Sequence, residues 1–241
     1  INQMKFIMKT IIILLFSFSI NIFSQSIWTP QTVPINYRLG SSFFLNNQTG
    51  WITGVSGSLI KTTNGGINWD IQNSGTTANL LSIFFINENT GWIGAQGEQG
   101  RKTTDGGNTW NPSIGYVYNN KLFDIFFINE NTGWYVNTSP GVNGIIYKTT
   151  NTGVNWIYQY QTTAYDLRSI QFLDPNTGWT CGYGGKIFKT TNGGTNWYEL
   201  FSGVTEILNE VFFINSNTGW AAGDDGSIIK TTNGGNSWLR Q

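Results

Sequence analysis

Histidine is absent from this 241-residue sequence, and cysteine occurs once, as Cys181. Without histidine, the chain cannot form a serine–histidine–aspartate triad or a histidine-ligated metal site. A single cysteine cannot close a disulfide within the chain, which argues against a disulfide-stapled scaffold. We therefore expect neither a metal nor a cofactor.

Charged residues are also few, at 11% of the sequence, and the 13 basic residues are balanced by 13 acidic ones. Nucleic-acid binding draws on many basic groups that displace phosphate counterions, so we expect no nucleic-acid partner. Aromatic residues, in contrast, make up 15% of the chain and include 11 tryptophans. Disordered chains are poor in such residues, so this composition predicts a folded, aromatic-rich protein.

The N-terminus has the pattern of a secretory signal peptide. Lys5 and Lys9 precede the apolar run Ile11–Ile20, and the small residue Ser24 follows it. We predict a signal peptide over residues 1–24, and hence a protein that is secreted, held at the cell surface or periplasmic. The run is too short for a comfortable membrane span, so we expect none after cleavage. An uncleaved anchor is the alternative.

The rest of the chain is organised around a turn motif, Lys-Thr-Thr-Asn-Gly-Gly-x-Asn-Trp, first seen at Lys61–Trp69. Its Asn or Asp can bond its own backbone, and the two glycines supply positive φ. The motif predicts a β-hairpin with a locked turn and a tryptophan anchor. Its five copies place the Asn or Asp at Asn64, Asp105, Asn151, Asn192 and Asn233, and the tryptophan at Trp69, Trp110, Trp156, Trp197 and Trp238.

A second motif, Phe-x-x-x-x-Thr-Gly-Trp, precedes each of these turns. We expect both tryptophan series to pack between repeats rather than to stack on sugars, because near-identical copies in register are typical of a core. The copies of the second motif end at Trp51, Trp92, Trp134, Trp179 and Trp220.

Each repeat holds four β-prone runs, which we term A to D in chain order. The spacings of the two motifs, which span the A–B and C–D turns, are the same in every repeat. The B–C and D–A segments vary; the B–C segment is longest at 136–144. In an antiparallel meander, all length variation then falls at one end, where binding residues usually lie.

Four strands in each repeat of about 40 residues predict an all-β fold, a β-propeller of four-stranded antiparallel blades. A right-handed β-helix is the alternative. We expect a leading strand and linker at 25–40, in which Trp28 starts a lone D strand. Such a strand needs a final A–B–C set, so we expect a larger ring that continues beyond Gln241. The five repeats are predicted at about 41–78, 79–120, 121–165, 166–206 and 207–241.

These repeats resemble those of two known families. Thr62–Trp69 and its copies resemble the Asp-box of bacterial neuraminidase-type repeats. The whole repeat is similar to the photosystem II stability/assembly factor family of propellers, a resemblance that covers about residues 27–241. It implies a secreted bacterial propeller of a type that often ends in a secretion-sorting domain. The photosystem factors carry an arginine-rich patch, whereas this chain has Arg38, Arg101, Arg168 and Arg240 alone, so we expect no photosystem role.

Residues that break the repeat are the candidates for ligand binding. Near the start of the A strands, Asp124 and Glu210 occupy a phase that is serine in the other three repeats, at Ser41, Ser82 and Ser169. Asp224 and Asp225 form an acidic pair in the last B–C segment, and Arg101 is expected to extend its cation outward at a blade edge. The remaining candidates, on the variable end, are Tyr116, Tyr118, Tyr165, Arg168 and Tyr183.

These residues favour a non-catalytic scaffold that binds a protein or a glycan. The alternative is a glycoside hydrolase or a carbohydrate-binding propeller, since Asp-box propellers include sialidases and xyloglucanases. A glycosidase needs two carboxylates about 5–10 Å apart, and Asp124 with Glu210 is the pair to test. A sialidase-like site also requires clustered arginines, and the four here lie at different phases of the repeat, so we expect them not to converge.

Overall fold

The computed structural model describes residues 30–114, 121–139, 142–163 and 165–241. The chain divides into Ile1–Gln31 and Thr32–Gln241, and everything below concerns the second unit. The predicted signal peptide and Trp28 therefore lie outside the described residues. No helix within the described ranges is long and apolar enough to cross a membrane.

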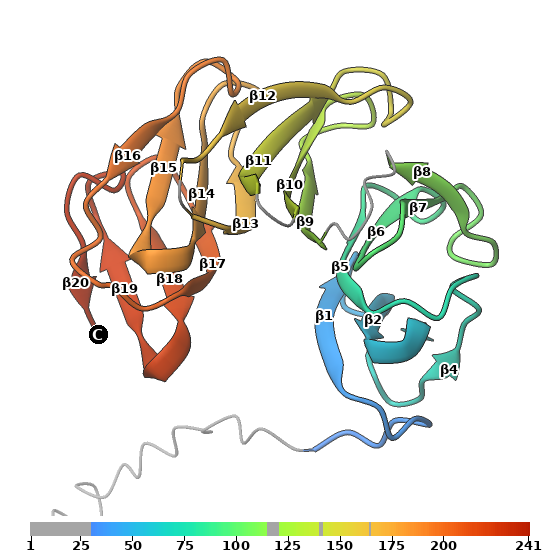
Figure 1. The fold of residues 1–241 in the computed structure, drawn as a ribbon. Coiled ribbons are helices and arrows are strands. Elements are labelled where there is room, and N and C mark those ends of the chain that lie inside the picture. The colour runs from blue at the N-terminus through green and yellow to red at the C-terminus, as the bar shows by residue number, and fades with distance from the viewer. Residues whose placement is uncertain (1–29, 115–120, 140–141, 164) are drawn as a thin grey trace, which may run out of the picture. The chain divides into compact units, whose positions relative to one another are not determined.

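The second unit consists of five four-stranded antiparallel sheets, each with its strands in chain order (Figure 1). Blade I has β1 (Leu39–Phe44), β2 (Gly50–Gly54), β3 (Leu59–Thr62) and β4 (Asp70–Ile71). Blade II has β5 (Leu80–Phe85), β6 (Gly91–Ala95), β7 (Gly100–Thr103) and β8 (Asn111–Ile114). Blade III has β9 (Lys121–Phe127), β10 (Gly133–Ser139), β11 (Val142–Thr149) and β12 (Ile157–Gln161).

Blade IV has β13 (Leu167–Phe172), β14 (Gly178–Gly182), β15 (Ile187–Thr190) and β16 (Tyr198–Leu200). Blade V has β17 (Leu208–Phe213), β18 (Gly219–Gly223), β19 (Ile228–Thr231) and β20 (Leu239–Arg240). Short 3-10 turns follow three of the B strands: η1 (Val55–Gly57), η2 (Tyr183–Gly185) and η3 (Asp224–Gly226). The predicted all-β propeller of five four-stranded repeats is confirmed.

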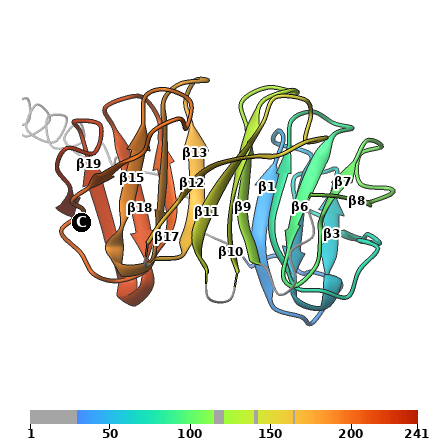
Figure 2. The same cartoon turned by 45° about the horizontal axis from the view of Figure 1, so that its top comes forward.

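The first strand of every blade lies on the inner side, and the fourth lies outside (Figures 1 and 2). Consecutive inner strands contact one another, from β1 to β5, β9, β13 and β17. β1 begins at Leu39, two residues before the segment predicted for the first repeat, because Leu39 pairs with Gly54 of β2. This arrangement brings the starts of five strands, far apart in sequence, around one centre.

The repeated turn is held by its own side chains, as its composition predicts. Thr62 Oγ1 accepts a hydrogen bond from the Gly66 N–H at 2.9 Å, and Asn64 Oδ1 accepts one from the Asn68 N–H at 2.9 Å. The Gly65 N–H then donates to the Gln48 carbonyl in the A–B turn at 2.8 Å. Equivalent bonds recur in the other four blades. The two turns of one end are thus bonded together, which explains why neither varies in length.

In the third repeat, the first glycine of this turn is replaced by Thr152, which has φ of 59°. A β-branched residue is strained in that left-handed region, whereas glycine is not. We expect Thr152→Gly to raise the free energy of unfolding by about 1 kcal/mol. The reciprocal variant, Gly193→Thr, should lower it, because a Cβ there would lie 2.8 Å from the Pro175 carbonyl oxygen. Paired thermal melts check both, and a loss of stability in Thr152→Gly would contradict the assignment of strain.

The second motif builds the joints between blades. In the B strand of one blade the tryptophan stacks on the phenylalanine at the end of the A strand of the next, with ring centroids 3.5–3.7 Å apart in all four joints. The glycine before each tryptophan makes room for the phenylalanine of its own blade: a Cβ on Gly91 would lie 2.7 Å from the Phe85 ring. Both tryptophan series therefore act as packing residues, and Trp51, Trp92, Trp134 and Trp179 are fully buried.

Candidate functional site

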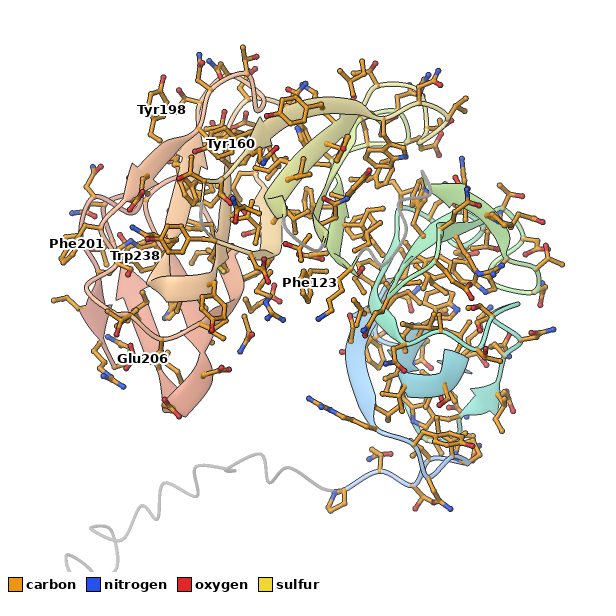
Figure 3. All side chains as sticks on the ribbon, in the orientation of Figure 1. Phe123, Tyr160, Tyr198, Phe201, Glu206 and Trp238 are labelled. Atoms are coloured by element: carbon orange, nitrogen blue, oxygen red, sulfur yellow. The ribbon has the colours of Figure 1, made fainter. Side chains whose placement is uncertain are left out.

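A cavity of about 530 Å³ lies at the centre of the unit, at the end where the B–C and D–A segments vary. All five blades contribute residues to it from the starts of their inner strands. Its charged lining consists of Arg38, Asp124, Arg168, Glu210 and Asp224. The remaining lining is Gly40, Ser41, Leu81, Ser82, Phe123, Ile207 and Asn209. Figure 3 shows Phe123 on the inner side of its blade.

A β-bulge near the start of every inner strand shapes this lining. The register with the neighbouring strand skips Gly40, Leu81, Phe123, Arg168 and Asn209 in turn. A bulge changes the direction in which the side chain of the extra residue points. All five bulged residues line the cavity. The strands can therefore present two consecutive residues to one side, which the alternation of a regular strand would not allow.

The carboxylates that directly follow the bulge, Asp124 and Glu210, line the same cavity, and both take part in bonds between blades. Asp124 accepts hydrogen bonds from the Ile125 N–H and, across the joint, from the Ile170 N–H, each at 2.8 Å. Ser169 Oγ donates to Glu210 at 3.2 Å and accepts from the Val211 N–H at 3.3 Å. These side chains tie blades III, IV and V at the inner strands.

Burial makes the charged forms of these two carboxyls costly. Burial and the nearby Glu210 raise the pKa of Asp124 to about 8, although the hydrogen bonds from the two backbone N–H groups act to lower it. Burial likewise raises the pKa of Glu210, against the hydrogen bond from Ser169. At neutral pH the pair therefore holds at least one proton.

Two of the four arginines do converge, contrary to the expectation from their phases. Arg38 immediately precedes β1 and Arg168 is the bulged residue of β13, and both line the cavity. The expectation rested on their different phases of the repeat; the bulge at Arg168 brings this residue to the cavity that Arg38 also lines. The guanidinium of Arg168 lies over the Phe123 ring at 4.1 Å.

None of the five charged lining residues forms an ion pair among the described residues. The buried Nε of Arg168 also has no hydrogen-bond partner. Asp224 accepts from Asn209 Nδ2 at 2.7 Å and Glu210 accepts from Ser169 Oγ at 3.2 Å, but both acidic residues are exposed. The cavity thus offers the donors of two arginines to a ligand, beside the carboxylates of Glu210 and Asp224.

The other predicted candidates do not line the cavity, although Tyr165 and Tyr183 lie near each other, because the Tyr183 N–H donates to the Asp166 carbonyl at 2.9 Å. Tyr183 is 49% exposed in η2, and Tyr165 lies beneath Lys186, whose Nζ is 4.8 Å from the ring centroid. Asp225 lies in the turn η3 with φ of 55°, within the last B–C segment. Arg101 does not extend outward: its side chain is only 13% exposed and lies 3.4 Å from Glu98. Tyr116 and Tyr118 lie outside the described residues.

Sequence reasoning missed Arg38, Phe123 and Asn209 as lining residues. Phe123 and Asn209 occupy the bulge position. The sequence gives no signal for this position, because its five residues have no chemical property in common. Beyond Asp124 and Glu210, a second cavity of about 350 Å³ continues between the inner strands and is lined by Phe43, Phe84, Phe126 and Phe212. The carboxyl pair therefore lies between two halves of the central space.

The fold and the repeated turn define a β-propeller of Asp-box blades with a central cavity. The family model described as photosynthesis system II assembly factor YCF48 matches residues 20–168 and 158–241, and the chain belongs to that family. Comparison with curated proteins gives no match.

Solved structures with the same fold include members of this family and enzymes. A structure described as YCF48 bound to D1 peptide is 20% identical, with a TM-score of 0.52 over 89% of this chain and 86% of the other. YCF48 from Cyanidioschyzon merolae is 18% identical, with a TM-score of 0.52 over 89% and 88%. The Niastella koreensis GH74 enzyme is 17% identical, with a TM-score of 0.70 over 84% of this chain but 38% of its own. At these identities the likeness shows the fold alone.

Proposed function

We propose that this protein is a non-catalytic binding propeller that takes an acidic segment of a protein partner in its central cavity. The observation that carries the proposal concerns Arg168. Its guanidinium lines the cavity, stacks on Phe123 and forms no ion pair among the described residues. We also propose that the protein is exported from the cytoplasm, as the predicted signal peptide at residues 1–24 indicates. Sequencing the N-terminus of the exported protein tests this.

Guanidinium groups bind carboxylates through parallel N–H donors, and such bonds are about twice as strong as neutral ones. Asp124 is bonded through both oxygens, and Glu210 and Asp224 accept from Ser169 and Asn209. No described residue forms an ion pair with Arg168 or Arg38, so both can meet a charged ligand. An acidic peptide, or a free C-terminal carboxylate, fits these donors. The family structure described as YCF48 bound to D1 peptide supports a peptide as the kind of ligand.

The glycosidase alternative has less support from the geometry. A retaining or inverting enzyme needs one ionised carboxylate that can reach substrate or water. Both oxygens of Asp124 accept backbone N–H groups, and burial raises its pKa. Asp124 is therefore poorly suited to act as a nucleophile or general base, and its bonds stabilise the joint between blades III and IV.

Arg168→Ala is expected to weaken binding of an acidic peptide pool with free C-termini by about 10- to 100-fold, the value of a charge-assisted hydrogen bond. Fluorescence anisotropy with labelled pools measures this, with Arg240→Ala as the matched control, since Arg240 lies on the outer strand β20. A lysine-rich, amidated pool should not bind. Equal binding of the basic pool, or an unchanged affinity in Arg168→Ala, would refute the proposal, and hydrolysis of xyloglucan lost in Asp124→Asn would favour the enzyme.

A further inference from the structure

The second cavity, of about 350 Å³, lies further along the same inner strands that line the first. In blade III, Phe123 and Asp124 line the first cavity, and Asp124 and Phe126 line the second. In blade IV, Arg168 lines the first and Gln171 lines the second. Each residue of a strand advances by about 3.3 Å, so three residues separate the two levels by about 10 Å. The cavities are therefore successive levels of one central space.

The two levels differ in chemistry. Arginine side chains line the first cavity, whereas no basic residue is among the described residues that line the second. Its wall is aromatic: the Phe84 ring centroid lies 5.4 Å from that of Phe126 and 5.0 Å from that of Phe43. Gln171 takes the same position in blade IV, and its amide bonds the N–H and the carbonyl of Phe213. The second level thus offers aromatic rings and few free polar groups.

The phenylalanines of this wall keep part of their surface open to the cavity. Phe84 and Phe126 are only half-buried, whereas the residue after each, Phe85 or Phe127, is at most 2% exposed in its joint. Blades II and III pack on a neighbour at both sides, so the open surface faces the centre. Covering apolar surface that water would otherwise contact is favourable in proportion to its area. The wall therefore favours an apolar group.

Asp124 and Glu210 line both cavities and so lie where the two levels meet. Both oxygens of Asp124 accept backbone N–H groups, and burial raises its pKa. Because the pair holds at least one proton at neutral pH, the passage between the levels does not place two negative charges beside a ligand.

We propose that the second cavity binds an apolar side chain of the peptide whose carboxylate meets Arg168, an assignment that rests on the proposed function. The ligand is an extended acidic segment with a large apolar residue about three residues from its carboxylate. That spacing matches the two levels, because an extended peptide also advances by about 3.3 Å per residue. Arg168 holds the charged end, and Phe84 and Phe126 cover the apolar side chain. A volume of about 350 Å³ is within the range of pockets that bind small organic groups.

Fluorescence anisotropy with three peptides tests this. Each ends in a free carboxylate and carries its label on the same N-terminal Gly-Ser linker. Phe-Gly-Gly-Asp places the ring three residues from the acid, Ser-Gly-Gly-Asp lacks the ring, and Gly-Gly-Phe-Asp moves it beside the acid. The wild type should bind the first at least about 10-fold more tightly than either of the others, the effect of burying one aromatic side chain.

Phe126→Gln introduces the residue type that blade IV carries at the same position, and Phe84→Gln does so in blade II. Each should reduce the ratio of the affinities for Phe-Gly-Gly-Asp and Ser-Gly-Gly-Asp to within about threefold. Because the ratio compares two peptides on one variant, a partly unfolded sample does not change it. The matched control is Phe201→Gln, which removes a ring that is 86% exposed and lines neither cavity; it should keep the ratio of the wild type.

The outcomes separate this inference from the function on which it rests. If the acidic peptides bind but the phenylalanine gives no advantage, or gives the same advantage beside the acid, the inference fails and the proposed function stands. If none of the three peptides binds, both fail. An advantage that survives in Phe126→Gln and in Phe84→Gln would show that the apolar side chain binds elsewhere, which overturns the assignment of the second cavity. Arg168→Ala should weaken the binding of all three peptides.

Discussion

Replacing Trp179 with alanine should lower the free energy of unfolding by about 3–5 kcal/mol, the usual cost of deleting a large buried aromatic side chain. Trp179 is fully buried and stacks on Phe213 of the next blade at 3.7 Å, with the planes 11° apart. Its indole N–H donates to the Gly234 carbonyl at 3.3 Å, and Lys189 lies over the ring. Alanine removes all of these contacts and leaves a cavity between two blades.

Trp220→Ala is the matched control, because the same residue type occupies the same position of the repeat but stacks on no phenylalanine among the described residues. In this chain it should cost far less than Trp179→Ala. Urea titrations of both variants measure the difference. If the two cost the same, the stability would come from contacts within a blade, and the role assigned to the joints would be wrong. If neither variant moves the midpoint, the tryptophans are not packing residues at all.

The stability of the wild type should fall as the pH rises from about 4 to about 8. Asp124 has a folded-state pKa raised to about 8 by burial, whereas an unfolded aspartate titrates near pH 3.9. Between these values the folded chain holds a proton that the unfolded chain has released, so raising the pH favours unfolding. The slope can reach about 1.4 kcal/mol per pH unit for one such group. Glu210, whose pKa is raised too, adds to the effect.

Asp124→Asn should flatten this slope, because the amide does not titrate. Its stability at any one pH should also be lower than that of the protonated wild type, since an amide accepts through one oxygen while Asp124 accepts through two. The change of the free energy of unfolding with pH, rather than its value at one pH, is therefore the test. Cys181, the buried thiol nearby, does not contribute in this window, because burial raises its pKa well above the ordinary value.

Asp105→Asn provides the control for the pH series. The hydrogen bonds from Thr109 and Thr103 lower the pKa of this exposed carboxyl to about 2, so it stays ionised in both states from pH 5 upward. The variant should keep the slope of the wild type between pH 5 and 8. Stability that rises with pH in the wild type, or a slope that Asp124→Asn and Glu210→Gln leave unchanged, would show that this carboxyl pair stays ionised in the folded protein.

The sequence by itself determined the blades. Each turn of the Thr62–Trp69 type is held by bonds among its own residues, and bonding between the A–B and C–D turns fixes their spacing. Such local chemistry repeats wherever the motif repeats, so the number of blades, the order of strands and the end with variable loops could be predicted. The packing role of the tryptophans followed for the same reason, since five copies in register need the same surroundings.

Only the tertiary structure decided the site. The bulges depend on pairing with a neighbouring strand. They bring Phe123, Arg168 and Asn209 to the cavity together with the residues that follow them, which the alternation of regular strands would not do. The phase of Asp124 and Glu210 predicted that they lie close, but the amide that engages Asp124 comes from Ile170, 46 residues further along the chain. Which charges remain free to bind a ligand depends on such long-range partners. A repeat specifies its own blade, whereas the centre is shaped by the residues in which five blades differ.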